Sequence, residues 1–314
     1  MSGDLSRVLV VGDLNPDLLL VGDVIPRFGQ AEQLLEAADL VIGGSAGIAA
    51  HGLALLGRKV SLVAAVGEDL FAAHVCDQLS AAGVSVDHVR RRSDVPTGLS
   101  VVLSHGDDRA TLTLPGAIPT LSVDEVVRTI AELAGAGLRH VHLCSLYLQR
   151  ALLSHAAQVL VAARDVGAST SLDTNGDPAG VWDGIEELLP LLDLVLPNRA
   201  EAIALGRDED PYVAAARIAG SGPMVVVKNG ALGAFAVASD RGLLEVAGVP
   251  VVTVDTTGAG DSFDAAFIDA WLDDLDVPEC LERAVLAGAL SVRALGGTAA
   301  QARREELMTV RKGT

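Results

Sequence analysis

One stretch near the end of the chain carries the clearest structural signal: Val254-Asp255-Thr256-Thr257-Gly258-Ala259-Gly260-Asp261-Ser262-Phe263. The apolar run before it, residues 249–254, is rich in β-branched side chains and predicts a buried strand. Residues 262–272 have apolar side chains at helical spacing and predict a helix. Gly258 and Gly260 lie between the two, so we expect a tight turn that leads into a helix N-terminus.

A helix start of this kind predicts an anion site. Its unpaired backbone N–H groups and the positive end of the helix dipole favour a negative charge, and Gly258 and Gly260 leave room for a phosphate. Asp261 would repel that anion, which makes sense if it deprotonates a neighbouring hydroxyl as the phosphoryl group arrives. The alternative is an ordinary acidic residue near a helix start, where Asp is favoured in any protein.

Composition limits the class of protein. The 314 residues allow one large α/β domain or two domains. Half of the residues are hydrophobic but only 3% are aromatic, which suits helices packed on a parallel sheet. The net charge of −18 argues against nucleic acid or an anionic membrane as a partner. Three widely spaced cysteines, no signal peptide and no membrane-spanning run lead us to expect a cytoplasmic protein.

The middle of the chain alternates strand and helix patterns, which predicts right-handed crossovers and a mainly parallel sheet. A hairpin over residues 234–246 should close this sheet with antiparallel strands. Two β-rich excursions, about 14–42 and 94–115, interrupt the alternation. We expect them to form a small accessory sheet that acts as a lid, because excursions of this size are usually functional. The alternative is two unrelated surface hairpins.

Polar residues after the first strand are candidates for ligand contacts, because ligands of open α/β sheets bind beyond the C-terminal ends of strands. Asn15 and Asp17 could bind hydroxyl groups, although both residue types are also common in turns. Gly43, Gly44 and Ser45 open a helix. That bare N-terminus suits either a polar ligand or close packing against a strand.

Two later strand ends carry further candidates. Asn198 and Glu201 have the spacing of a capping box, and the spacing alone favours that role over a hydrated Mg²⁺ site. Lys228 lies in a loop with Gly230 and Gly233, where an ammonium group surrounded by backbone amides suits a phosphate. The loop is not a Walker motif, because the Gly-Lys-Ser/Thr ending is missing.

The order of these signals resembles the ribokinase-like (PfkB) carbohydrate kinase family across nearly the whole chain. The stretch Asp-Thr-Thr-Gly-Ala-Gly-Asp-Ser-Phe, residues 255–263, is highly specific to that family. Also in order are Gly12-Asp13 with Asp17, the Gly43-Gly44 helix start, Asp173 with Asn175, Asn198 to Glu201, and the Lys228 loop. The resemblance implies one kinase domain over residues 1–314, a three-layer α/β/α sandwich with a mainly parallel central sheet and a small β-sheet lid.

By this resemblance Asp261 is the catalytic base that takes the proton of a sugar hydroxyl. Gly258, Ala259 and Gly260 form with it the anion hole for the transferring phosphoryl group. We expect the amides around Asp261 to give its carboxyl group a low pKa. Phosphoryl transfer tolerates a weak base, because the hydroxyl becomes acidic as its oxygen bonds to phosphorus.

The resemblance also assigns ligand sites. The motif that positions Mg²⁺ through water contains Asn198 and Glu201, which reverses the preference for a simple cap. ATP contacts are implied for Asn198, Lys228, Gly230, Gly233, Gly258 and Gly260. Sugar contacts are expected at Asn15, Asp17, Gly43, Gly44 and Ser45. A monovalent-cation site, for K⁺, is implied at Asp255, Thr257, Ser291, Ala294 and Gly296.

One position departs from the family pattern. Ile48 stands where members usually have an asparagine that binds sugar hydroxyls, and Ser45, Asn15 or His51 could compensate. We therefore expect an ATP- and Mg²⁺-dependent kinase that phosphorylates a hydroxymethyl group of a small sugar or sugar acid, of the ribose, fructose or 2-keto-3-deoxygluconate type. The alternatives are a nucleoside kinase of the same family and a non-catalytic sugar- or nucleotide-binding sensor. Pairing of lid strands between two chains would give a homodimer.

Overall fold

The computed structural model describes residues 6–29, 32–105, 108–238 and 242–308. Within these residues a nine-stranded sheet forms the centre, in the order β15-β14-β13-β12-β11-β10-β1-β4-β6. Its strands are β1 (Arg7–Val11), β4 (Lys59–Val63), β6 (Val84–Ser85), β10 (Leu138–Cys144), β11 (Ser169–Asp173), β12 (Leu194–Val195), β13 (Met224–Lys228), β14 (Gly233–Ala238) and β15 (Gly242–Ala247). All neighbours pair in parallel except β13–β14 and β14–β15, so the predicted antiparallel hairpin closes the sheet.

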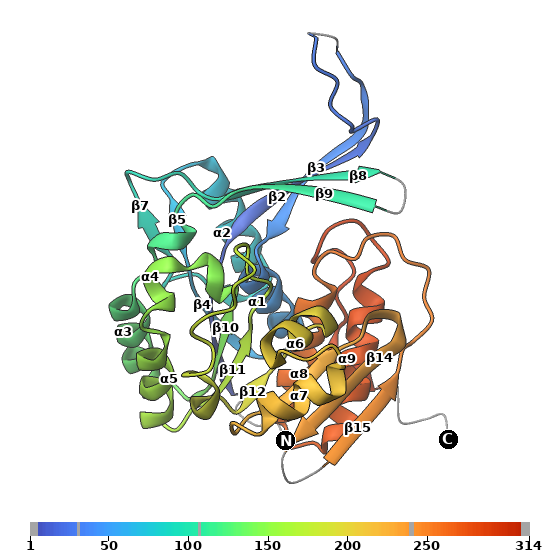
Figure 1. The fold of residues 1–314 in the computed structure, drawn as a ribbon. Helices are drawn as coiled ribbons and strands as arrows, with labels where there is room; N and C mark the ends of the chain where they lie inside the picture. Colours follow the sequence, from blue (N-terminus) through green and yellow to red (C-terminus); the bar gives the residue numbers. More distant parts are fainter. Residues whose placement is uncertain (1–5, 30–31, 106–107, 239–241, 309–314) are drawn as a thin grey trace.

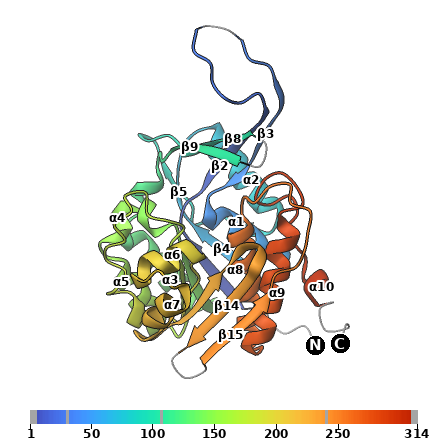
Figure 2. The ribbon, with the colours of Figure 1, turned by 45° about the vertical axis from the view of Figure 1, so that its right-hand side comes forward.

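Helices cover both faces of this sheet. One face packs against α1 (Ser45–Leu55), α2 (Leu70–Ala81), α8 (Ala259–Leu272), α9 (Val277–Ser291) and α10 (Arg304–Leu307). The other packs against α3 (Val123–Ala134), α4 (Arg150–Leu153), α5 (Ala156–Asp165), α6 (Arg199–Gly206) and α7 (Pro211–Ala219). Figure 2 shows β14 and β15 between α7 and α9. The expected three-layer α/β/α sandwich is confirmed.

Strand β1 shows why the sheet needs both layers. Val8 and Val10 belong to one hydrophobic cluster, and Leu9 and Val11 to the other. Successive side chains of a strand point to opposite faces, so an all-apolar strand must be covered on both sides. These four residues are completely buried as a result, between the neighbouring strands β10 and β4.

A second sheet lies beyond the C-terminal end of β1. It contains β2 (Asn15–Gly22), β3 (Leu35–Gly43), β8 (Leu99–His105) and β9 (Asp108–Leu114), in the order β3-β2-β8-β9. β2 pairs in parallel with β8, with Asp17 opposite Ser100. The two excursions therefore form one sheet, which spans the top of the molecule in Figure 1. Residues 30–31 and 106–107, within the excursions, lie outside the described residues; β5 (Ala65–Gly67) and β7 (Arg90–Arg92) form a separate small ladder.

The strand predicted over residues 249–254 is wrong. The segment has no strand pairing, and Val252 is 85% exposed. Pro250 has no N–H to donate to a ladder, and the N–H of Val254 instead bonds to Val292 O at the end of α9, at 2.7 Å. Among the described helices, none has the length and apolar character needed to cross a bilayer.

Candidate active site

Helix α8 begins at a turn that only glycine fits well. Gly258 caps the helix with φ of 70°, in the left-handed region, and a Cβ there would lie 2.7 Å from Gly297 Cα. The N–H of Ala259 donates to Thr256 O at 3.3 Å. The neighbouring amides of Gly258, Gly260 and Asp261, all within the described residues, have no protein acceptor. Three N–H groups at the positive end of the helix are thus available to an anion.

Asp261 lies in the first turn of α8 and lines the adjacent pocket. Ser45 Oγ, from the start of α1, donates a hydrogen bond to Asp261 Oδ1. Burial, followed by repulsion from Asp173, raises the pKa of Asp261 to about 7. The expected low pKa is therefore wrong: the hydrogen bond from Ser45 and the charge of Lys228 lower the pKa, but desolvation has the larger effect.

Lys228 brings a positive charge to the same place. Its Nζ lies 2.6 Å from Asp173 Oδ2 and 3.0 Å from Asp264 Oδ2. A Cβ on Gly260 would lie 3.4 Å from this Nζ, so the ammonium group is beside the free amides. Burial alone would lower the pKa of Lys228, but Asp173 and Asp264 raise it well above its usual value. Lys228 is therefore charged at neutral pH.

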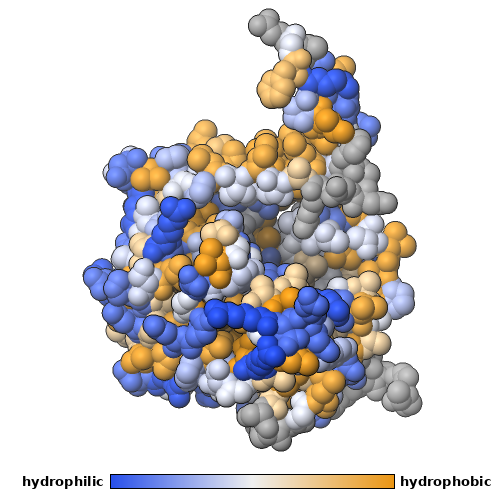
Figure 3. All heavy atoms as spheres, in the orientation of Figure 1, coloured by the Kyte–Doolittle hydropathy of each residue, from blue (hydrophilic) through white to orange (hydrophobic). Residues whose placement is uncertain are grey.

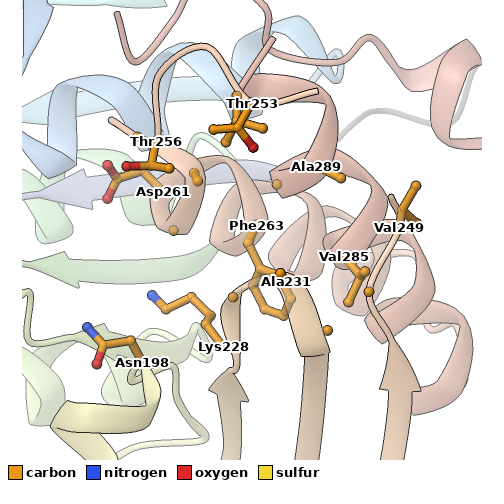
Figure 4. Close-up of a pocket in the computed structure, with 18 of the residues that line it drawn as sticks. Asn198, Lys228, Ala231, Val249, Thr253, Thr256, Asp261, Phe263, Val285 and Ala289 are labelled. Carbon is orange, nitrogen blue, oxygen red and sulfur yellow. The ribbon is translucent and has the colours of Figure 1, made fainter. Parts of the chain in front are cut away.

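A pocket of about 770 Å³ opens in front of these groups, within the range of about 300–1,000 Å³ typical of small-molecule sites. Figure 4 shows Asn198, Lys228 and Asp261 at one end of the pocket. The other end is apolar, with Val249, Val285 and Ala289. The pocket also has Gly230, Gly233, Gly258 and Gly260 in its lining. Its polar and apolar ends suit a ligand with a charged part and an apolar, flat part.

Asn198 and Glu201 form the predicted capping box at the start of α6. Glu201 N donates to Asn198 Oδ1 at 3.0 Å, and Asn198 N donates to Glu201 Oε2 at 2.8 Å. Both residues line the pocket, and burial together with Asp173 raises the pKa of Glu201 to about 7. No group of three or more His, Cys, Asp or Glu residues suited to direct metal binding occurs in the described ranges. Protein oxygens alone would not complete a metal shell here.

A second group of polar residues lies where β1 and β2 meet α1. Asn15 Nδ2 donates to Asp17 Oδ1 at 3.0 Å and to Ser100 Oγ at 3.3 Å. Gly43 is required beside them, because a Cβ there would overlap the Asp17 carboxylate. Burial and the charge of Asp13 raise the pKa of Asp17 to about 6. The surface is hollowed beneath the second sheet, as Figure 3 shows.

Gly44 and Ser45 connect this group to Asp261. A Cβ on Gly44 would lie 2.7 Å from Asp13 O, so the turn into α1 packs directly against the loop after β1. Asp13 Oδ1 accepts a hydrogen bond from Ala46 N at 3.2 Å. Asp13 was not among the predicted site residues, although its place at the end of the first strand was a usable signal.

Ile48 has no polar group that could take the place of the asparagine amide usual at this position in the family. It is buried, and Cβ atoms built on Gly258 and Gly297 would lie 2.9 Å from its Cγ2 and 2.5 Å from its Cδ1. Ile48 therefore packs against the turn before α8. His51 Nδ1 lies 2.6 Å from Gln301 Oε1, so His51 is bound within the interior.

The residues expected to bind a monovalent cation are partly gathered around one carboxylate. Asp255 Oδ1 accepts from Thr257 N at 2.9 Å, and Asp255 Oδ2 accepts from Gly296 N at 2.8 Å. Ser291 lies at the end of α9, and its Oγ donates to Gly288 O at 2.9 Å. Ala294 lies in the turn that leads from α9 to Gly296. Through these hydrogen bonds, Asp255 thus connects the two loops that flank the start of α8.

Comparison with known proteins agrees with this architecture. The family model described as pfkB family carbohydrate kinase matches residues 5–303. The chain belongs to the pfkB family of carbohydrate kinases. It is therefore a sugar kinase, a phosphotransferase with an alcohol group as acceptor.

Relatives of this pfkB-family kinase are named for different substrates. The ATP-dependent ribose-1-phosphate kinase of Halopiger xanaduensis is 33% identical, over 94% of this chain and 94% of that protein. The 2-dehydro-3-deoxygluconokinase of Bacillus subtilis is 30% identical, over 85% of each chain. The structure of Arabidopsis thaliana ribokinase complexed with ribose and ATP has a TM-score of 0.84 and 26% identity, and the match covers 99% of this chain and 100% of that one.

Asp264 is a second residue of the kinase, besides Asp13, that the sequence analysis did not place in the site. It lies one turn after Asp261 on α8, is fully buried, and binds Lys228. Burial raises the pKa of Asp264 well above its usual value, although the charge of Lys228 opposes this. An aspartate between the apolar residues Phe263 and Ala265 was a detectable signal, because a charge on a buried helix face needs a partner.

Proposed function

We propose that this kinase transfers the γ-phosphoryl group of ATP to a hydroxymethyl group of a small sugar, with Asp261 as general base. The observation that carries the proposal is the convergence of the Asp261 carboxylate, the free amides of Gly258 and Gly260, and Lys228 Nζ at one point. A base, an anion hole and a cation are the groups that this transfer requires.

The proposed reaction uses these groups in one step. Asp261, with a pKa of about 7, accepts the hydroxyl proton as the sugar oxygen bonds to the γ-phosphorus. The bond from that phosphorus to the bridging oxygen breaks, and ADP leaves with the electron pair. The amides of Gly258, Gly260 and Asp261 stabilise the negative charge on the phosphoryl oxygens. The predicted amide of Ala259 is turned toward Thr256 O and contributes less in this geometry.

We place ATP in the pocket of about 770 Å³, with its adenine ring at the apolar end and its phosphates beside Lys228. Gly230 and Gly233 also line this pocket. Asn198 and Glu201 fit a Mg²⁺ ion held through water, because such an ion prefers few protein oxygens. When bound, the ion would neutralise phosphate charge. K⁺ binding beside Asp255 and Thr257 remains our expectation for the cation site.

The test of this function is Asp261→Asn. We expect the variant to fold and to bind ATP, but to lose phosphorylation by at least about 10³-fold, because it has no base and the pre-formed anion hole remains. The matched control is Asp274→Asn, the same change at an exposed residue just beyond the other end of α8. ADP release is measured with a panel of pentoses, hexoses, keto-deoxy acids and nucleosides. Near-normal turnover by Asp261→Asn would exclude Asp261 as the base.

The second sheet is proposed to act as a lid and as a dimer contact. Its outer face is apolar: Leu18 is opposite Val101, and Val101 is opposite Leu112, which is 61% exposed. Faces of this kind mark protein contacts, and a second copy of the chain would cover it. We expect Leu112→Glu to shift a dimer to monomers in sedimentation experiments, while Val161→Glu on α5 does not. A wild-type monomer at high concentration would contradict the proposal.

We also propose a cytoplasmic location. Cys76, Cys144 and Cys280 are free and buried, as expected in a reducing compartment.

A further inference from the structure

We propose that the acceptor of this kinase is a neutral polyhydroxy compound, and that sugar phosphates and sugar acids are excluded by charge. The inference rests on the proposed function, because it takes the cleft between Asp17 and Asp261 as the acceptor site. It goes further by choosing between acceptor classes that the named relatives divide among themselves.

The described groups around the proposed acceptor position are acidic or neutral. Asp13, Asp17 and Asp261 are 5%, 7% and 8% exposed, respectively. Asp17 is bonded by Asn15, and Asp261 by Ser45. Asp13 accepts from Ala46 N. The hydrogen-bond partners of these three carboxylates are thus amides and hydroxyls, with no lysine or arginine in this part of the described structure.

The nearest cations are committed elsewhere. Lys228 lies on the nucleotide side, where Asp173 and Asp264 hold its ammonium group beside the free amides of α8. Arg58 is buried and bonds Asp269 Oδ1 at 2.5 Å, about 12 Å along α8 from Asp261 at 1.5 Å per residue.

Arg109 is the one cationic residue on the strands of the lid sheet. Its backbone pairs with Ser104, which is opposite Val21. Val21 lies four residues from Asp17 along β2, about 13 Å at 3.3 Å per residue. The backbone of Arg109 is therefore well away from the buried carboxylates.

These groups match hydroxyls better than anions. A carboxylate accepts hydrogen bonds from sugar hydroxyls, and the Ser45 and Ser100 hydroxyls and the Asn15 amide both donate and accept. A phosphate or carboxylate on the acceptor would bring a like charge close to Asp13 and Asp17. Two unit charges about 6 Å apart at an effective dielectric constant of about 20 repel enough to weaken binding about 100-fold.

The test compares matched pairs of acceptors that differ only in charge: fructose with fructose 1-phosphate, and ribose with ribose 1-phosphate. Turnover is followed by ADP release, and binding is measured separately by calorimetry with an unreactive ATP analogue. We expect the neutral member of at least one pair to be bound and phosphorylated at least about 100-fold better than its anionic partner. Equal or tighter binding of the anionic member would overturn the inference and leave the kinase assignment intact.

A charge variant tests the cause. Asp17→Asn keeps the shape and removes one negative charge, so we expect the preference for the neutral member to fall about 10-fold or more. If Asp17 had only a structural role, the substitution would weaken the binding of both members equally, and that result would overturn the charge argument. Asp77→Asn, on the exposed face of α2, is the control and should leave the preference unchanged. Binding of neutral sugars without turnover would contradict the proposed function but support this inference, whereas failure of every neutral sugar to bind would overturn it.

Discussion

Lys228 shows at the scale of single residues how the site holds its charge. Its ammonium group contacts Asp173 and Asp264 in place of water, and both of these side chains are almost completely buried. The attraction of Lys228, against the effect of burial, holds the pKa of Asp173 below its usual value. The lysine and its acids are therefore interdependent, since removing the cation leaves two carboxylates in a poorly solvated place.

A double-mutant cycle tests this dependence. We expect Lys228→Gln to lower the free energy of unfolding by about 3–5 kcal/mol, and the double variant Lys228→Gln/Asp264→Asn to recover at least about 1 kcal/mol of that loss. The measurement is urea unfolding at pH 7.5. The exposed pair Arg207–Glu186 is the control, where a similar cycle should give a coupling of less than about 1 kcal/mol. Additive losses at Lys228 and Asp264 would refute the coupling.

The electrostatics of single residues were the hardest part to predict from the sequence. The positions of Asp261 and Lys228 follow from strand and helix patterns, and the structure brings both into one pocket. The pKa of Asp261 does not follow, because it depends on burial and on Asp173, which lies 88 residues earlier in the chain. The local sequence indicates the effect of the helix dipole on this pKa, but it does not indicate the effect of desolvation.

At the scale of elements, the turn before α8 carries the most weight. Gly258→Ala puts a Cβ against Gly297 Cα and forces a residue with a side chain to φ of 70°. We expect a loss of stability of about 1–3 kcal/mol and a fall in kcat of at least about 10-fold, because the amides move. Gly135→Ala is the matched control, since that glycine has φ of −74° and open space around its Cβ position. Thermal unfolding and steady-state kinetics of both variants check the prediction; equal behaviour would contradict it.

Elements with two apolar faces were predictable, and ligand-lining segments were not. The alternation of strands and helices indicates the parallel sheet because β1 and its neighbours must be buried on both sides. Residues 249–254 have the same β-branched composition, yet Val249 and Val251 line a pocket. An apolar segment that lines a pocket and an apolar strand that is covered by a helix have the same sequence pattern. They differ in position: β15 already forms the edge of the sheet, and the segment that follows it does not continue the sheet.

At the scale of the whole molecule, the second sheet joins segments that are distant in the chain. Asp17 pairs with Ser100 across 83 residues, so the sequence indicates two β-rich excursions but not their register. The register matters, because it places Asp17 on the side of Gly43 and the base. The proposed acceptor site is therefore a product of long-range pairing, as is the concentration of acids within it.

That concentration of acids should make stability and activity oppose each other as pH changes. The folded protein raises the pKa of Asp261 from 3.8 to about 7, of Glu201 from 4.5 to about 7 and of Asp17 from 3.8 to about 6. At these three acids the folded state binds protons that the unfolded state does not, so their contribution to stability falls as pH rises from about 5 to 8. Activity should rise over the same range, because the base must lose its proton.

Burial lowers the pKa of His140 to about 3 and of His142 to about 4, so these histidines oppose the acids and raise stability as pH rises through about 6.5. The effect of the acids is therefore read from a variant that removes one of them, while kcat/KM should fall with decreasing pH around pH 7. Asp261→Asn should be more stable than the wild type by about 1–3 kcal/mol at pH 8, and this difference should shrink toward pH 5, because one pKa unit corresponds to about 1.4 kcal/mol. Thermal unfolding of both proteins without ligands between pH 5 and 8 measures this difference. Groups present in both proteins cancel in the comparison, including the buried histidines and the acids Asp69 and Asp273, whose pKa is lowered in the folded state. A stability difference between Asp261→Asn and the wild type that stays constant from pH 5 to 8 would show that Asp261 is already charged at pH 5, and Asp261 would then be the weaker base that the helix N-terminus alone predicts.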